Sequence, residues 1–154
     1  MVILDSGSTT TAIACALRNH QHLTIITNAV NISGSALEVI LTGGSLRKNS
    51  FSLVVPIAEE TLHKLHADIL FLGVDGFDVQ HGLSTPNLLE SKVNRAMIEI
   101  SKTTVAVCDS SKFGKRSLSL IAPTSSLHHV ITDSGIPKAA LSALKKSGVA
   151  VTIV

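Results

Sequence analysis

Residues 5–10 read Asp-Ser-Gly-Ser-Thr-Thr, a run of small and hydroxyl-bearing side chains with the composition of a phosphate-binding loop. The run lies between the apolar segment 2–4 and residues 9–18, whose apolar side chains have helical spacing. Backbone N–H groups at a helix N-terminus lack helical partners and favour anions, and Gly7 lets an anion approach them closely. The run therefore predicts a phosphate cradle, and the alternative is an ordinary N-cap made by Ser8 or Thr9.

Charged side chains follow later predicted strands, where they are well placed for a sugar phosphate. Lys112 lies in a strand-end loop and Lys92 lies in the first turns of a helix. Either lysine supplies a point charge for phosphate, unless it is an ordinary surface residue. Asp75 and Asp78 could accept hydrogen bonds from sugar hydroxyls, or one could act as a base; the alternative is a turn aspartate.

The sequence predicts no metal site and no cofactor. His63 and His66 are spaced three residues apart on a predicted helix, but no third ligand with sensible spacing accompanies them. No Gly-x-Ser-x-Gly motif occurs, so nucleophilic catalysis by a serine triad has no support beyond the presence of the residue types.

Short β-branched runs alternate with helical stretches along the whole chain. Continuous rather than alternating apolar runs are typical of parallel strands covered by helices on both faces. The pattern predicts an α/β fold with an open, mostly parallel, doubly wound sheet, and ligands of such sheets bind at the carboxyl ends of the strands. The predicted strands are residues 2–4, 23–26, 37–41, 67–74, 104–107, 129–132 and 149–154. The predicted helices are residues 9–18, 57–66, 87–101 and 137–146.

Composition restricts the class of protein. The 154 residues are 45% hydrophobic, 16% charged and 3% aromatic, which predicts one domain with a sizeable core. A net charge of +2 without basic runs does not indicate a DNA-binding surface. The scarcity of aromatic residues argues against a surface on which the bases of single-stranded nucleic acid stack. No apolar run reaches the ~18 residues that span a bilayer, so no membrane partner and a cytoplasmic location are expected.

Two further expectations concern the thiols and the first strand. Cys15 and Cys108 lie in apolar-periodic segments without a Cys-x-x-Cys pattern, which predicts buried, reduced thiols. The strand at residues 2–4 has nothing before it, so it is expected to be an exposed edge.

The order of the strand-end loops resembles the effector-sensing domain of the DeoR family of bacterial transcriptional regulators. The loops read Asp-Ser-Gly-Ser-Thr-Thr, Thr-Asn, Thr-Gly-Gly, Gly-Val-Asp-Gly and Asp-Ser-Ser-Lys-Phe, and the resemblance runs from Val2 to Val154. It implies one sugar-phosphate-sensing domain over residues 1–154, with a fold related to ribose-5-phosphate isomerase. It also implies a repressor of sugar catabolism whose N-terminal winged helix-turn-helix, absent from this chain, binds operator DNA. A homo-oligomer is expected.

The resemblance assigns an effector site and no catalytic residue. By position it implies a phosphate cradle with Asp5 at its mouth, a neighbouring wall, a sugar-facing loop and two cationic contacts. These effector-binding residues are Asp5, Ser6, Gly7, Ser8, Thr9, Thr10, Thr27, Asn28, Gly43, Gly44, Asp75, Gly76, Lys92 and Lys112.

Two alternatives stay open. The segment 88–92 also resembles the Leu-Leu-Arg-Glu-Lys stretch of the isomerase, which makes an aldose–ketose isomerase the rival function. Ser91 stands where the isomerase has glutamate, and Glu90 is rotated from it by about 100° on a helix. The catalytic carboxylate is therefore expected to be misplaced, and the chain to be a non-catalytic relative. A purely oligomerising domain with an empty site is the third possibility.

Overall fold

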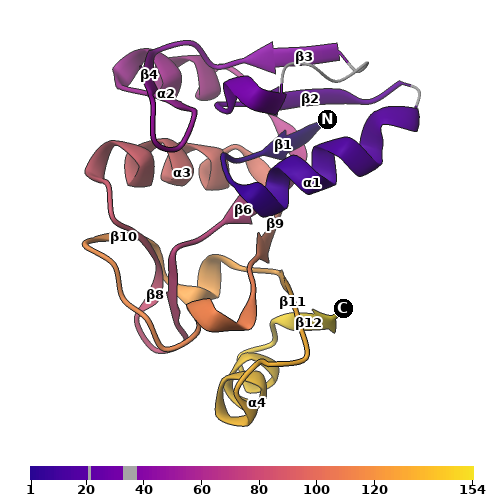
Figure 1. Cartoon of the computed structure of the whole chain (residues 1–154), viewed down its shortest axis with the longest axis vertical. Helices are drawn as coiled ribbons and strands as arrows, with labels where there is room; N and C mark the ends of the chain where they lie inside the picture. Colours follow the sequence, from indigo (N-terminus) through magenta and orange to yellow (C-terminus); the bar gives the residue numbers. More distant parts are fainter. Residues whose placement is uncertain (21, 33–37) are drawn as a thin grey trace.

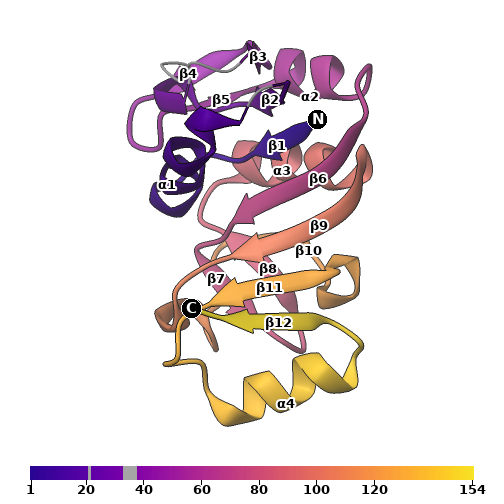
Figure 2. The ribbon, with the colours of Figure 1, turned by 90° about the vertical axis from the view of Figure 1, so that its right-hand side faces the viewer.

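A seven-stranded parallel sheet forms the centre of the computed structural model, which describes residues 1–20, 22–32 and 38–154. Every pair of neighbouring strands in it is parallel, so the predicted α/β class is confirmed. Figure 2 shows the strands side by side in the order β12-β11-β9-β6-β1-β2-β3. The strands are β1 (Val2–Leu4), β2 (Thr24–Thr27), β3 (Glu38–Leu41), β6 (Ala67–Gly73), β9 (Ser101–Val107), β11 (His129–Thr132) and β12 (Ala150–Ile153).

Helices lie on both faces of this sheet, as predicted, but they cover the two faces unequally. α1 (Ser8–Ala16) packs against β1 and β6 on one face, and α2 (Pro56–Leu62) and α3 (Leu88–Glu99) lie on the other (Figure 1). α4 (Lys138–Lys146) follows β11 and packs its Leu144 into the core on the α3 side. The short 3-10 helices are η1 (Leu17–Asn19), η2 (Val30–Ile32), η3 (Ser110–Lys112) and η4 (Thr124–Ser126).

The alternation of side chains along a central strand explains the two core clusters. In β6, Leu70 and Leu72 are fully buried in the larger cluster, which contains residues of α2, α3 and α4. Phe71 points to the other face and packs against the smaller cluster around Ala14 of α1. Successive strand residues face opposite sides, so a strand buried on both sides must be continuously apolar.

Two small antiparallel sheets complete the fold, and the sequence did not predict them. One is the hairpin of β4 (Ser45–Arg47) and β5 (Ser52–Val54), and the other contains β7 (Gly76–Asp78), β8 (Gly82–Thr85) and β10 (Ser119–Ala122). Each of these strands has only three or four residues, too few for a periodic pattern, and several begin with the glycine or serine that is typical of loops. β8 and β10 pack against α3 on one face of the parallel sheet (Figure 2), and Phe77, Leu83 and Ile121 of this small sheet belong to the larger core cluster there.

Two expectations were wrong. β1 is not an exposed edge: it pairs with both β2 and β6, and its Ile3 and Leu4 are fully buried. The crossovers of a doubly wound sheet place the first strand at the centre, whatever precedes it in the chain. Cys15 is exposed on the outer side of α1, and only Cys108 is buried.

Among the described helices, none has both the length and the apolar character needed to cross a membrane.

Candidate functional site

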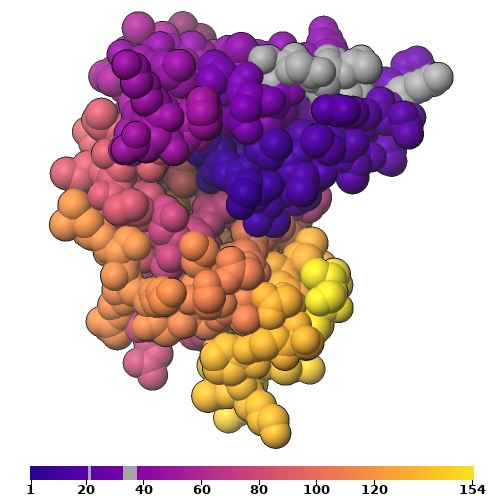
Figure 3. Space-filling view, viewed as in Figure 1, coloured from indigo at the N-terminus to yellow at the C-terminus, as the bar shows by residue number. Residues whose placement is uncertain are grey.

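A cavity of about 590 Å³ lies at the carboxyl ends of β1, β6 and β9. Figure 3 shows the molecule hollowed between the indigo segment that carries α1 and the magenta and orange segments next to it. The cavity is lined by residues 5–11, 31, 49–51, 73–75, 85, 90, 94, 107–109 and 112. Its position matches the rule that open parallel sheets bind ligands outside the carboxyl ends of their strands.

The N-terminus of α1 forms one wall of the cavity. The N-cap is Gly7, and no side chain caps the first turn, so the predicted alternative of a Ser8 or Thr9 cap does not occur. The hydroxyls of Thr10 and Thr11 donate back to the carbonyl oxygen of Gly7, at 3.0 and 2.7 Å. The first amides of an α-helix have no partner within the helix, and here they face a cavity with the positive end of the helix dipole.

Lys112 brings a positive charge to the same cavity from the end of β9. Its helix η3 is capped by the Asp109 side chain, which accepts from the amide of Ser111 at 2.9 Å. Asp133, after β11, accepts from the amide of Ser110 at 2.6 Å and fixes the start of the turn. No carboxylate of the described residues lies within ion-pair distance of Lys112, so its charge is free for a ligand.

Carboxyl groups form the wall between these two positive features. Asp5 follows β1 and is only 3% exposed. Burial raises the pKa of Asp5 to about 8, because the charged form loses its water; the amide of Ser6 opposes the shift, and the nearby charges of Glu90 and Asp75 add to it. Asp75, which follows β6, is exposed and accepts a hydrogen bond from the Thr85 hydroxyl at 2.9 Å.

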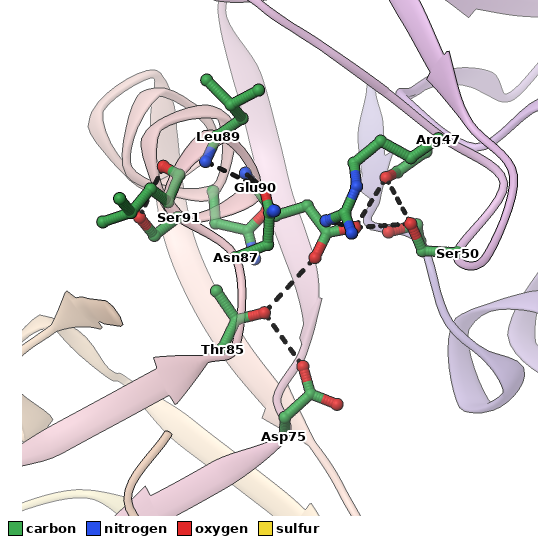
Figure 4. Close-up of polar contacts among 12 residues, drawn as sticks. Arg47, Ser50, Asp75, Thr85, Asn87, Leu89, Glu90 and Ser91 are labelled. Carbon is green, nitrogen blue, oxygen red and sulfur yellow. Dashed lines mark hydrogen bonds and ion pairs between the residues drawn. The ribbon is translucent and has the colours of Figure 1, made fainter. Parts of the chain in front are cut away.

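Glu90 is the most highly bonded of the carboxylates (Figure 4). It accepts from the hydroxyls of Ser50 and Ser52 at 2.5 and 2.8 Å, and its Oε1 lies 3.0 Å from Nη1 of Arg47. Its other oxygen, Oε2, lies 3.4 Å from the hydroxyl of Thr85. The serine and threonine hydroxyls donate to this nearly buried carboxylate, and the Arg47 guanidinium pairs with its charge.

The start of α3 determines that Glu90 faces the cavity. The side chain of Asn87 caps the helix by accepting from the amides of Leu89 and Glu90, at 3.0 and 3.1 Å. Ser91, the next residue, turns away and pairs its hydroxyl with that of Ser119 in β10 at 2.6 Å. The helix thus presents Glu90, and not Ser91, to the cavity, so a carboxylate does reach it from α3. Its misplacement relative to the catalytic glutamate of the isomerase stays a prediction.

The structure brings eight of the predicted effector-binding residues together around the cavity. These are Asp5, Ser6, Gly7, Ser8, Thr9, Thr10, Asp75 and Lys112. Their binding role stays a prediction, but their convergence from β1, α1, β6 and η3 has the geometry that the loops implied.

Six predicted residues lie outside the cavity lining. Thr27 donates its hydroxyl to the carbonyl oxygen of Leu4 at 2.6 Å, and Asn28 is fully buried beside it. The other four are Gly43, Gly44, Gly76 and Lys92.

The glycines outside the cavity have structural roles. Gly44 has φ +114°, and a Cβ there would overlap the carbonyl oxygen of Val54, so it carries the chain tightly past β5. At Gly76 a Cβ would lie 2.7 Å from the carbonyl oxygen of Lys115. These two positions thus need glycine whether or not a ligand binds.

The two remaining charged candidates also point elsewhere. Lys92 is exposed on α3, two residues beyond Glu90 and so on a different side of the helix. Asp78 pairs with Arg116 at 2.7 Å and with His81 at 3.1 Å, and the Arg116 contact holds the pKa of Asp78 well below its usual range. His63 pairs with Glu99 at 3.2 Å, and no three His, Cys, Asp or Glu side chains of the described residues are grouped to hold a metal ion.

Sequence reasoning missed one wall of the cavity. Residues 49–51 come from the β4–β5 hairpin, and Glu90 and Asn94 come from one face of α3. The spacing of Glu90 and Asn94, one helical turn apart, is the signal that could have paired them. Nothing local marks the hairpin as part of the site.

The two thiols are expected to differ sharply in reactivity. Burial raises the pKa of Cys108 to about 12, and the neighbouring Asp109 adds to the effect, whereas Cys15 is exposed. A thiol-specific reagent should therefore modify one cysteine per folded chain and both after denaturation. Cys15→Ser should abolish the reaction of the folded chain; rapid modification of two thiols in the native wild type would contradict this assignment.

Comparison with known proteins places the geometry in a family. Residues 1–134 match the family described as the DeoR C terminal sensor domain. The chain belongs to the DeoR sensor-domain family. This confirms the resemblance read from the strand-end loops.

The relatives of this DeoR-family chain include named transcriptional regulators. It is 42% identical over 99% of its length to a putative aga operon transcriptional repressor of Escherichia coli O157:H7 and 39% identical, again over 99%, to an uncharacterized HTH-type transcriptional regulator of Bacillus subtilis (strain 168). It is 30% identical over 93% of its length to the glycerol-3-phosphate regulon repressor of Escherichia coli (strain K12). The matched regions make up 59%, 61% and 59% of these three proteins, so the chain spans about 60% of their length.

Solved structures support the fold. The chain superimposes on ribose 5 phosphate isomerase A from Neisseria gonorrhoeae with a TM-score of 0.51 and 12% identity, covering 75% of this chain and 46% of that one. For ribose 5-phosphate isomerase from Plasmodium falciparum the TM-score is 0.51 at 16% identity, with 73% and 44% covered. The DeoR sensor domain thus has a ribose-5-phosphate isomerase-like fold.

Proposed function

We propose that this DeoR-family domain binds a phosphorylated sugar in the cavity and transmits its presence to a DNA-binding region of the intact regulator. The observation that carries the proposal is one cavity with two chemically different walls. The uncapped N-terminus of α1 and the unpaired Lys112 provide positive potential for a phosphate. Asp5, Asp75 and Glu90 provide acceptors for sugar hydroxyls.

The regulatory part of the proposal follows from thermodynamic linkage. An effector shifts an equilibrium between two arrangements only by its difference in affinity for them. A ligand held between α1, α3 and η3 contacts elements from three parts of the chain, so its affinity depends on their relative placement. Operator DNA, the sugar effector and a homo-oligomer are the partners that this function implies.

Calorimetric titration tests the proposal directly. A suitable panel is ribose 5-phosphate, fructose 6-phosphate, glucose 6-phosphate, glucosamine 6-phosphate and glycerol 3-phosphate, each with its unphosphorylated parent, and inorganic phosphate. At least one phosphorylated compound should bind, and its parent should bind far more weakly. Equal binding of compound and parent, or binding of none, would refute a phosphate-anchored effector.

Lys112→Ala should weaken binding of that compound by tenfold or more, because a charge-assisted contact to phosphate contributes about 1.5–3 kcal/mol. Lys92→Ala is the matched control, since Lys92 is exposed and outside the cavity lining, and it should leave the affinity unchanged. If Lys92→Ala weakens binding and Lys112→Ala does not, the phosphate lies on the exposed side of α3 that carries Lys92, away from the α1 cradle.

Isomerase activity remains the second candidate, and one observation favours it. Asp5, with its raised pKa, and Glu90, with its ion pair, are two carboxyl groups in different environments on one cavity. Glu90 is nevertheless held by Arg47, Ser50 and Ser52, which lowers its availability as a base. Conversion of ribose 5-phosphate to its ketose, abolished by Glu90→Gln, would establish the enzyme; its absence favours the sensor.

A further inference from the structure

The β4–β5 hairpin has a fixed inner strand and a loosely held outer part. β5 is buried, and its Leu53 amide donates to the carbonyl oxygen of Asn28 at 2.7 Å. Residues 45–51, which we call the outer arm, comprise β4 and the turn that follows it. β4 pairs only with β5 among the described strands, and Leu46 and Phe51 of the outer arm are 51% and 54% exposed.

The side-chain contacts that join the outer arm to α3 converge on one carboxylate. Arg47 and Ser50 both contact Oε1 of Glu90, at 3.0 and 2.5 Å (Figure 4). Ser52, on the fixed strand, contacts the same oxygen at 2.8 Å and also pairs with Ser50 at 2.7 Å. A backbone bond from Val30 to Phe51 at 3.1 Å supplements them. The position of the outer arm therefore depends strongly on which groups contact the Glu90 carboxylate.

Glu90 also faces the cavity, where a ligand can reach it. It is nearly buried, it lines the cavity together with Ser50 and Phe51, and its second oxygen leads through Thr85 to Asp75. A group that enters the cavity and donates a hydrogen bond to Glu90 competes with Ser50 for the same acceptor. Exchange of one hydroxyl for another on a carboxylate changes little in total energy but changes which element is held.

We propose that Glu90 is the residue that couples effector occupancy to the outer arm. Hydroxyl groups of the bound sugar replace Ser50 on the Glu90 carboxylate, so the outer arm keeps only the Arg47 ion pair of its two side-chain attachments to α3. Residues 45–51 thereby become the segment that changes position on binding. The inference rests on the proposed function, because it takes the effector to be a sugar phosphate. It makes Glu90 a positioning residue that acts on the outer arm through Ser50 and Arg47.

Hydrogen exchange measured by mass spectrometry tests the attachment without any ligand. Glu90→Gln should accelerate exchange of amides 45–51 by tenfold or more, while β6 and β9 keep their protection. Arg47→Met, which leaves the cavity-facing carboxylate in place, should produce a smaller acceleration in the same segment and remains informative if Glu90→Gln disturbs the fold. Glu99→Gln, an exposed glutamate of the same helix, is the matched control and should change nothing in residues 45–51. Unchanged exchange of 45–51 in both test variants would overturn the attachment.

The second arm of the experiment adds ligand to the wild-type chain. Each of the five phosphates of the calorimetric panel, and inorganic phosphate, is added before exchange. A sugar phosphate that binds should accelerate exchange of 45–51 several-fold, and inorganic phosphate should not, because it fills the α1 cradle without hydroxyls near Glu90. Binding with unchanged or slower exchange of 45–51 would refute the coupling and leave the proposed function standing. Binding of none of the five would refute both.

Discussion

Replacing Phe77 by alanine is expected to lower the free energy of unfolding by about 3–5 kcal/mol, the usual cost of removing a buried phenyl ring. Phe77 lies in β7 with no exposed surface, and its ring stacks on that of Phe113 with centroids 5.1 Å apart. The small β10-β8-β7 sheet cannot close the resulting space without moving η3. Denaturant titration of the variant, with the slope compared to that of the wild type, measures the change.

Phe51→Ala is the matched control for Phe77→Ala. Phe51 is 54% exposed, so its loss should change stability by no more than about 0.5 kcal/mol. Phe77→Ala should also weaken phosphate binding, because it removes the ring that packs against Phe113, the residue directly after Lys112. If Phe77→Ala lowers the free energy of unfolding by less than about 1 kcal/mol, the backbone contacts of the Lys112 loop, and not the aromatic pair, hold this part of the core together.

The centre of the parallel sheet could be predicted from the sequence because its inner strands are covered on both faces. The central strands contain uninterrupted apolar runs, Val2–Leu4 in β1 and residues 69–72 in β6, and such runs remain recognisable without knowledge of their neighbours. The antiparallel strands depend on tertiary contacts instead. β7 reads Gly-Phe-Asp and β4 reads Ser-Leu-Arg, sequences with no local preference that would distinguish them from loops.

The candidate site could be predicted where its chemistry is local, and could not where it arises from packing. The α1 cradle is a contiguous run, so residues 5–10 were found as a unit. Lys112 and Lys92 have the same residue type in similar contexts, and only the rotation of α3 shows that Lys92 points elsewhere. The sequence alone gives no reason to place Glu90 at the site, yet the Asn87 cap fixes the start of α3 so that Glu90 faces the cavity. Neighbouring positions on a helix point about 100° apart, so the exact start of α3 decides whether residue 90 or residue 91 faces the cavity.

Asp5 should make the domain less stable as the pH rises through the neutral range. Burial raises its pKa from 3.8 to about 8 in the folded chain, so between these values the folded state holds a proton that the unfolded state has released. The stabilisation is fully present below pH 3.8 and is lost as the pH rises through about 8, at up to about 1.4 kcal/mol per pH unit. The total over this window is on the order of several kcal/mol. The lowered pKa values of Asp78, Asp109 and Asp133 act with the opposite sign and at lower pH.

Asp5→Asn isolates this effect, because asparagine keeps the shape of the protonated acid without a charge to desolvate. Its free energy of unfolding should exceed that of the wild type by several kcal/mol at pH 8 and converge with it near pH 4; thermal or denaturant unfolding at unit pH steps measures both limits. Asp78→Asn, which removes an exposed ion-paired carboxylate, should give no gain at pH 8. Parallel curves for Asp5→Asn and wild type would show that Asp5 ionises normally. A more stable Asp5→Asn variant that binds the sugar phosphate more weakly would show that this buried carboxyl group serves ligand binding although it destabilises the fold.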